Sequence, residues 1–182
     1  MRRTTLILLT FSLLAVTVFA VDMWNDNQAL RVTMRNARGH HNGSITLYRL
    51  QGHATLITVN VRGLTPGFHG FHIHEHGRCE VTAEGEFITA GGHYDTSGNH
   101  HGQHSGDMPT LLADARGNAT ISFHTRNFDL SALLDDDGTA IIIHADADNF
   151  ANIPARYGDA DATTLANGDS GARIACGVIT RG

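Results

Sequence analysis

Short β-like runs, each closed by turn residues, dominate this chain of 182 residues. Gly, Asn and Pro bound the runs, for instance at Asn42, Gly43, Pro66 and Gly67, and such residues favour tight turns. The expected strands are residues 30–34, 44–50, 55–61, 69–75, 118–124, 139–144 and 172–179. Many short strands without a helical period predict an all-β fold, an antiparallel sandwich or barrel.

Two long stretches interrupt this pattern, residues 76–109 and residues 145–171. Each begins directly after a run that carries histidines. Long loops without secondary structure are uncommon in compact domains and are usually functional. We therefore expect the functional site where these two stretches meet the strands before them.

The first twenty residues have the composition of a secretory signal peptide. Arg2 and Arg3 form a basic start, residues 6–20 are almost entirely apolar, and the small Ala20 suits cleavage after it. A membrane anchor is the alternative, but about 15 apolar residues are short for a span. The sequence predicts a signal peptide at residues 1–20, a flexible N-terminus at 21–29 and one domain at 30–182. The mature protein would be secreted or periplasmic, with no membrane attachment after cleavage.

The net charge limits the kinds of binding partner, and the cysteine content bears on the redox state of the compartment. Residues 21–182 contain 11 arginines, no lysine and 18 acidic residues, a net charge of −7. The absence of a basic run argues against nucleic acid as a partner. Cys79 and Cys176 are the two cysteines, and export into an oxidising compartment predicts a disulfide between them. Two buried free thiols are the alternative.

Thirteen histidines are concentrated in a few segments. His72 and His74 lie two residues apart in an apolar run, so their side chains point to one face of a strand. The other candidates are His76, His93, His100, His101, His104 and, at the end of a later run, His144. A lone histidine is usually an ordinary core or surface residue, but this clustering predicts a metal site.

The residue types narrow the choice of metal. Asp107 follows His104 by three residues and adds a carboxylate to the imidazoles. Imidazole donors suit copper or zinc, and a histidine-rich site with one carboxylate suits tetrahedral zinc. These donor types alone allow either one metal ion or two.

Five segments, in order and with compatible spacing, resemble the copper/zinc superoxide dismutase family, in its secreted, bacterial type. They are residues 70–75 (Gly-Phe-His-Ile-His-Glu), 91–94, 106–107, 143–144 and 168–179. The resemblance covers residues 31–179. It implies an eight-stranded Greek-key β-barrel, immunoglobulin-like in architecture, with two long functional loops. The implied activity is copper-dependent disproportionation of superoxide to dioxygen and hydrogen peroxide, as a defence against extracytoplasmic superoxide.

The resemblance also assigns roles to individual residues. One copper ion per subunit would be held by His72, His74, His93 and His144. One zinc ion would be held by His93, His101, His104 and Asp107. His93 would bridge both ions and carry a proton in the reaction, and Arg173 would attract and orient the anion. Asp148 would hydrogen-bond one ligand of each metal, and Cys79 would pair with Cys176.

Several details differ from the family pattern or have an alternative. Only two residues separate His101 from His104, fewer than in most members, and this predicts strained zinc coordination. His100 competes with His101 on spacing alone, although the family register favours His101. Asp148 is alternatively a turn cap, and Arg173 alternatively a partner in a surface ion pair.

Two other functions stay open beside the enzyme, as does the oligomeric state. A non-catalytic copper-binding or copper-delivery domain could use the same fold, but the copper histidines and Arg173 are all present here. A structural adhesion sandwich would not need the histidine cluster. The resemblance is compatible with a homodimer, and superoxide is the expected substrate.

Overall fold

The computed structural model describes residues 29–182. The predicted signal peptide and residues 21–28 lie outside the described residues. The strands are β1 (Ala29–Asn36), β2 (His41–Arg49), β3 (Thr55–Val61), β4 (Gly67–His69), β5 (Phe71–His74), β6 (Val81–Thr82), β7 (Gly85–Glu86), β8 (Leu111–Ala113), β9 (Ala119–Thr125), β10 (Ala140–His144) and β11 (Arg173–Arg181). Helix α1 (Ala162–Asn167) is short, and 3₁₀ turns span Gln51–His53, Ile88–Ala90, Ala132–Leu134 and Ala155–Tyr157.

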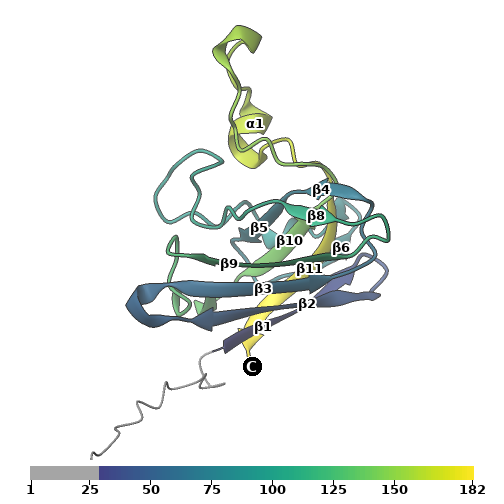
Figure 1. The fold of residues 1–182 in the computed structure, drawn as a ribbon, viewed down its shortest axis with the longest axis vertical. Coiled ribbons are helices and arrows are strands. Elements are labelled where there is room, and N and C mark those ends of the chain that lie inside the picture. The colour runs from purple at the N-terminus through teal and green to yellow at the C-terminus, as the bar shows by residue number, and fades with distance from the viewer. Residues whose placement is uncertain (1–28) are drawn as a thin grey trace, which may run out of the picture.

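The strands form a curled antiparallel sheet with the order β5-β10-β11-β1-β2-β3-β9 (Figure 1). Strand β8 lies beside β9 and pairs with β4, and β4 leads into β5 after Gly70. If β4 and β5 are counted as one interrupted strand, eight strands surround the core as a barrel. This architecture confirms the predicted all-β class with its antiparallel barrel.

The predicted strand at residues 69–75 is interrupted at Gly70. Before it, β4 pairs with β8, and after it, β5 pairs with β10. A Cβ atom on Gly70 would lie 2.5 Å from the Cβ of Ser170, so the second long loop passes directly against this glycine. Three further strands, β6, β7 and β8, were not predicted, because two or three residues show too little periodicity.

Alternation along β5 and β10 separates the core from the site. Phe71, Ile73, Ile141 and Ile143 are fully buried and belong to the main hydrophobic core. Burial of such side chains contributes roughly 1.5–3 kcal/mol each. The residues between them, including His72 and His74, point to the opposite face because successive side chains alternate. The core therefore fixes which face presents the histidines.

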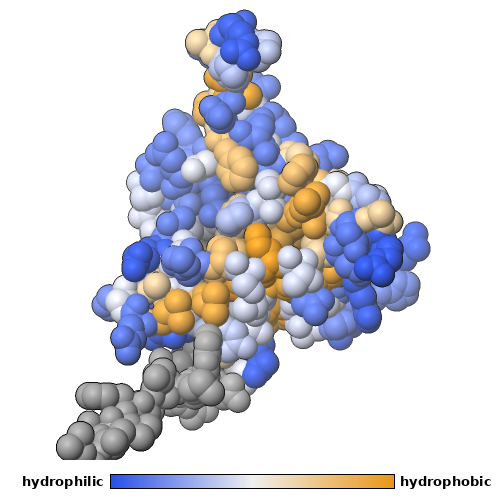
Figure 2. Space-filling view, viewed as in Figure 1, coloured by the Kyte–Doolittle hydropathy of each residue, from blue (hydrophilic) through white to orange (hydrophobic). Residues whose placement is uncertain are grey.

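The β4–β8 pair also has one inner and one outer face. Leu111 and His69 are fully buried, whereas Phe68 and Leu112, opposite each other in the register, are 56% and 59% exposed. Figure 2 shows hydrophobic residues gathered in the middle of one face of the molecule and hydrophilic residues towards its periphery. No helix within residues 29–182 is long and apolar enough to cross a membrane.

Candidate metal centre

Two long loops cover the outer face of β5 and β10 and bury the histidines there. His93 comes from the first loop and forms an isolated bridge with His74, while His144 ends β10. The exposed fraction is 0% for His72 and His74, 8% for His93 and 3% for His144. Desolvated imidazoles in such a cluster favour the neutral form, which is the form that binds metals.

Four imidazoles form the first donor group, those of His72, His74, His93 and His144. One donor nitrogen from each lies within 4.8 Å of the others, and the Nε2 atoms of His74 and His144 are 3.4 Å apart. The Nδ1–H groups of His74 and His144 donate to the carbonyls of Gly91 and Gly171, both at 3.1 Å. These hydrogen bonds leave the Nε2 lone pairs of both rings free to face the centre.

The remaining two rings of this group have buried nitrogens without a hydrogen-bond partner. These atoms are Nδ1 of His72 and Nε2 of His93. A buried nitrogen without a partner is costly in a protein interior. A metal ion bound by the four nitrogens would satisfy both atoms, so the donor set fits copper.

The second donor group surrounds one carboxylate oxygen, Oδ1 of Asp107. It lies 3.2 Å from Nδ1 of His93, 3.3 Å from Nδ1 of His101 and 3.4 Å from Nδ1 of His104. Three imidazoles and one carboxylate fit tetrahedral zinc. The short segment between His101 and His104 brings both rings to Asp107. His104 nevertheless lies outside the set of donor atoms within 4.8 Å of one another, which consists of His72, His93, His101 and Asp107. His100, the alternative to His101, is exposed.

Asp148 connects the two donor groups. Its Oδ2 accepts a hydrogen bond from Nε2 of His72 and its Oδ1 accepts one from Nε2 of His101, both at 2.7 Å. It also accepts from the Phe150 amide, so it forms the turn as well as the link. Asp148 thus caps a turn and also hydrogen-bonds one ring of each donor group. A Cβ on Gly168 would collide with Asp148 Oδ1 and His101 Nε2, so this contact requires glycine.

Arg173 is held beside the first donor group by carbonyl oxygens. Its Nη1 donates to Phe87 O at 2.7 Å and its Nη2 to Gly91 O at 2.6 Å. Gly91 O also accepts from His74, so one carbonyl positions both side chains. The positive charge of Arg173 lowers the pKa of His74 and His144, after the larger effect of burial. Among residues 29–182, carbonyls rather than a carboxylate hold this guanidinium, which does not match a surface ion pair.

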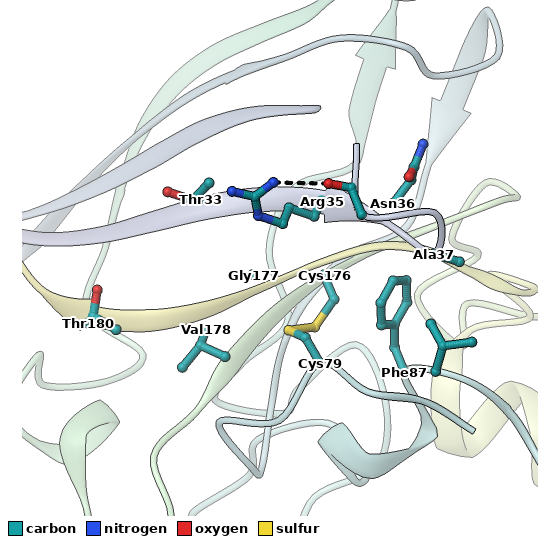
Figure 3. A pocket seen from close by; sticks show the side chains of 12 residues that line it. Thr33, Arg35, Asn36, Ala37, Cys79, Phe87, Cys176, Gly177, Val178 and Thr180 are labelled. Atoms are coloured by element: carbon teal, nitrogen blue, oxygen red, sulfur yellow. Dashed lines mark hydrogen bonds between the residues drawn. A yellow bond between two sulfur atoms is a disulfide. The ribbon is translucent and has the colours of Figure 1, made fainter. Parts of the chain in front are cut away.

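The disulfide Cys79–Cys176 ties the first loop to β11, with a Cα–Cα distance of 5.6 Å. Beside it lies a pocket of about 440 Å³ between β1, β11 and the first loop (Figure 3). No histidine lines this pocket, so it is separate from the donor groups. Phe87, which supplies a carbonyl to Arg173, lines the pocket next to the disulfide.

Comparison with known proteins agrees with this centre. The family model for copper/zinc superoxide dismutase matches residues 41–179. The chain belongs to the copper/zinc superoxide dismutase family. The Cu-Zn superoxide dismutase of Mycobacterium tuberculosis is 44% identical over 142 residues, which are 70% of this chain and 59% of that protein. The chain thus spans about three fifths of that relative.

Two further relatives extend the comparison. The extracellular Cu-Zn superoxide dismutase of Brugia pahangi is 32% identical over 152 residues, 80% of this chain and 72% of that protein. The structure of the Cu/Zn superoxide dismutase from Brucella abortus superposes with a TM-score of 0.65 at 30% identity. This superposition covers 84% of this chain and 99% of that chain. The family fold therefore spans the region that carries both donor groups.

Sequence reasoning missed His69 as part of this dismutase-family site. The ring is fully buried, with Nδ1 2.7 Å from the carbonyl oxygen of His144 and Nε2 2.8 Å from that of Thr65. It therefore ties the backbone of His144 to the segment after β3. The only sequence signal was its place at the start of the run that contains His72 and His74.

We expect acid to destabilise the metal-free protein. Burial lowers the pKa of His144 to about 3 and that of His93 to about 4, from the ordinary 6.5. The unfolded chain therefore binds more protons, and the free energy of unfolding falls as the pH drops from about 6.5 towards 4. His101 opposes this trend: burial lowers its pKa, but Asp107 and Asp148 together raise it to about 9. Its contribution is complete below about pH 6.5 and is lost as the pH rises through about 9.

Burial lowers the pKa of His72 and His74 as well, so the four histidines with lowered pKa values outweigh His101 in acid. Urea unfolding of the metal-free protein at about pH 7 and about pH 5 should show a net loss on the order of 2 kcal/mol at the lower pH. Equal or greater stability at pH 5 would contradict these pKa assignments.

Proposed function

We propose that the chain is a copper-dependent superoxide dismutase, which converts superoxide to dioxygen and hydrogen peroxide outside the cytoplasm. The observation that carries this proposal is the pair of buried donor groups sharing His93, with Arg173 beside the first of them. An adhesion domain would have no use for buried rings with unpartnered nitrogens. A binding-only copper domain would have no use for an arginine held over its donors.

The donor atoms support a distinct metal for each group. Copper would be held by Nδ1 of His72 and by the Nε2 atoms of His74, His93 and His144. Zinc would be held by the Nδ1 atoms of His93, His101 and His104 and by Oδ1 of Asp107. Copper supplies one-electron redox chemistry, whereas zinc does not change oxidation state and would serve to hold the loop.

Residues of the protein would bind the superoxide anion and transfer protons. Arg173 carries a positive charge next to His74, where it would attract superoxide and orient it. His93 can hold a proton at Nε2 when this nitrogen does not bind a metal, and can pass it to the product. Asp148 fixes the proton on Nε2 of His72 and of His101, so that their Nδ1 atoms stay available. In total, two superoxide anions and two protons give one dioxygen and one hydrogen peroxide.

The proposal includes export and assembly. Cleavage after Ala20 would release a protein that begins at Val21, and N-terminal sequencing of the exported protein tests this. An intact N-terminus on the exported protein would contradict the signal peptide. We also propose a homodimer, and sedimentation equilibrium at micromolar concentration should give twice the chain mass. A single-chain mass at those concentrations would contradict it.

Metal content and activity together test the function. The purified exported protein should contain about one copper and one zinc per chain, and the copper-loaded form should remove superoxide in a stopped-flow assay. Metal-free protein should be inactive and should regain activity with copper but not with zinc alone. Bound copper without dismutation would contradict the proposal and favour a copper-delivery domain.

A further inference from the structure

Asp95 follows His93 by two residues and is the main hydrogen-bond acceptor in the loop that carries the second donor group. Its Oδ1 accepts hydrogen bonds from the Ser97 hydroxyl at 2.7 Å, the Ser97 amide at 3.2 Å and the Ser105 amide at 3.4 Å. Its Oδ2 accepts from the Asn99 amide at 2.8 Å. Asn99 comes two residues before His101, and Ser105 directly follows His104. One carboxylate thus holds both ends of the short segment between these ligands.

Neighbouring side chains complete the network around Asp95. The hydroxyls of Thr96 and Ser105 are 2.8 Å apart, and Ser105 is buried. The Asn99 side-chain amide donates to the Ser97 hydroxyl at 2.6 Å and to the Gln103 carbonyl at 3.3 Å. Side chains that belong to neither donor group therefore link the two halves of this loop by hydrogen bonds.

Asp107 accepts hydrogen bonds from the backbone of the same segment. Its Oδ2 accepts from the amides of Gly102 at 2.7 Å and His104 at 3.0 Å, while its Oδ1 faces the three imidazoles. The segment between His101 and His104 therefore lies between two aspartates. Asp107 would change its interactions when a metal binds, whereas the contacts of Asp95 involve no donor atom.

We propose that Asp95 is a positioning residue that shapes the short ligand segment before any metal is bound, and so sets the affinity for zinc. The inference rests on the proposed zinc site. A short segment allows few backbone conformations. If the backbone at Asn99 or Ser105 shifted, His101 and His104 would move away from Asp107. Preorganising the ligands lowers the conformational entropy lost on binding. Zinc should be affected far more than copper, because three of the four proposed copper ligands lie on β5 and β10 and only the shared His93 lies near Asp95.

Asp114 provides a matched control in the β8–β9 turn. It accepts from the amides of Arg116 at 2.8 Å and Asn118 at 2.9 Å, as Asp95 does within its own loop. The hydrogen bond from Asn118 is the main cause that lowers the Asp114 pKa to about 2. Burial raises the Asp95 pKa, but hydrogen bonds from Ser97, Asn99 and Ser105 bring it to about 2 as well. Both carboxylates therefore accept from backbone amides in a turn, and only Asp95 adjoins the donor groups.

The test compares Asp95→Ala and Asp114→Ala in the full mature protein, stripped of metal. Zinc and copper affinities are measured separately, by competition of each ion alone against a coloured chelator. The visible spectrum of bound cobalt(II) reports the zinc-site geometry. For Asp95→Ala we expect a loss of zinc affinity of about 10–100-fold, as for other groups that orient metal ligands, and an altered cobalt spectrum. Copper affinity should stay within about twofold, and Asp114→Ala should leave both unchanged.

Asp95→Asn refines the test, because its amide keeps one acceptor oxygen but presents a donor to the Asn99 amide. It should bind zinc with an affinity between those of Asp95→Ala and the unaltered protein. Unchanged zinc affinity in Asp95→Ala, or an equal loss in Asp114→Ala, would overturn the positioning role. If the unaltered protein binds no zinc here, the proposed zinc site fails together with this inference. The proposed dismutase activity would still be tested separately, by the stopped-flow assay of the copper-loaded protein.

Discussion

Replacing Cys79 and Cys176 by alanine should lower the free energy of unfolding by about 4–5 kcal/mol, which corresponds to a closed loop of 97 residues in the chain-entropy model. The disulfide restricts the unfolded chain, so its removal favours unfolding. Activity per bound copper should fall as well. Cys176 packs with Phe87 in a small second core, and the Phe87 carbonyl holds Arg173. Urea unfolding of the metal-loaded double variant measures the first effect and a stopped-flow assay the second.

A thiol reductant supplies the control for the cysteine variants. Reduction should destabilise the unaltered protein to the level of the double variant and should leave the double variant unchanged. If the variant unfolds at the same urea concentration as the oxidised protein, the native loop is held by its packing, and the disulfide contributes little.

Arg173→Glu should lower kcat/KM by at least about 10-fold at low ionic strength and invert its salt dependence. In the unaltered protein, added salt screens the attraction between the guanidinium and the anionic substrate, so the rate falls. In the variant a carboxylate lies beside the first donor group, and salt relieves repulsion. The effect should be large because the chain has no lysine and a net charge of −7 over residues 21–182, so few other cations compensate.

Arg116→Glu is the matched charge control for this substitution. Its side chain is 84% exposed in the turn between β8 and β9, so the same change in net charge should alter the rate only slightly. Stopped-flow rates at several salt concentrations, normalised to bound copper, separate the two variants. Equal rates for Arg173→Glu and the unaltered protein at low ionic strength would contradict the steering role.

Most of the sheet could be predicted from local pattern. The run at residues 55–61 coincides with β3, and the runs that correspond to β1, β2, β9, β10 and β11 differ from them by a few residues at their ends. The errors have a tertiary cause. Gly70 interrupts the run that contains β5, and Ser170, one hundred residues away, packs against this glycine. A glycine inside a strand pattern indicates a bulge or a close approach of another backbone, but it does not indicate which distant segment approaches.

The candidate site was predictable to a different extent for each residue. Alternation placed His72 and His74 on one face, clustering supplied the other candidate ligands, and the family resemblance assigned them to copper or zinc. Spacing alone did not separate His100 from His101. The fold distinguishes them, because His101 is buried against Asp148 while His100 is exposed.

The sequence by itself determined the donor types, the face shared by His72 and His74, the pair of cysteines and the acidic balance, because these depend on residue identity and on the two-residue period of a strand. Only the tertiary structure decided which nitrogen of each ring points into a donor group, that His69 contacts the backbone of His144, and that Asp95 accepts from the amides of Asn99 and Ser105. Those choices depend on hydrogen bonds between segments that meet only when two long loops fold back over β5 and β10. Local periodicity specifies the face of a strand, but it carries no information on which distant loop will cover that face.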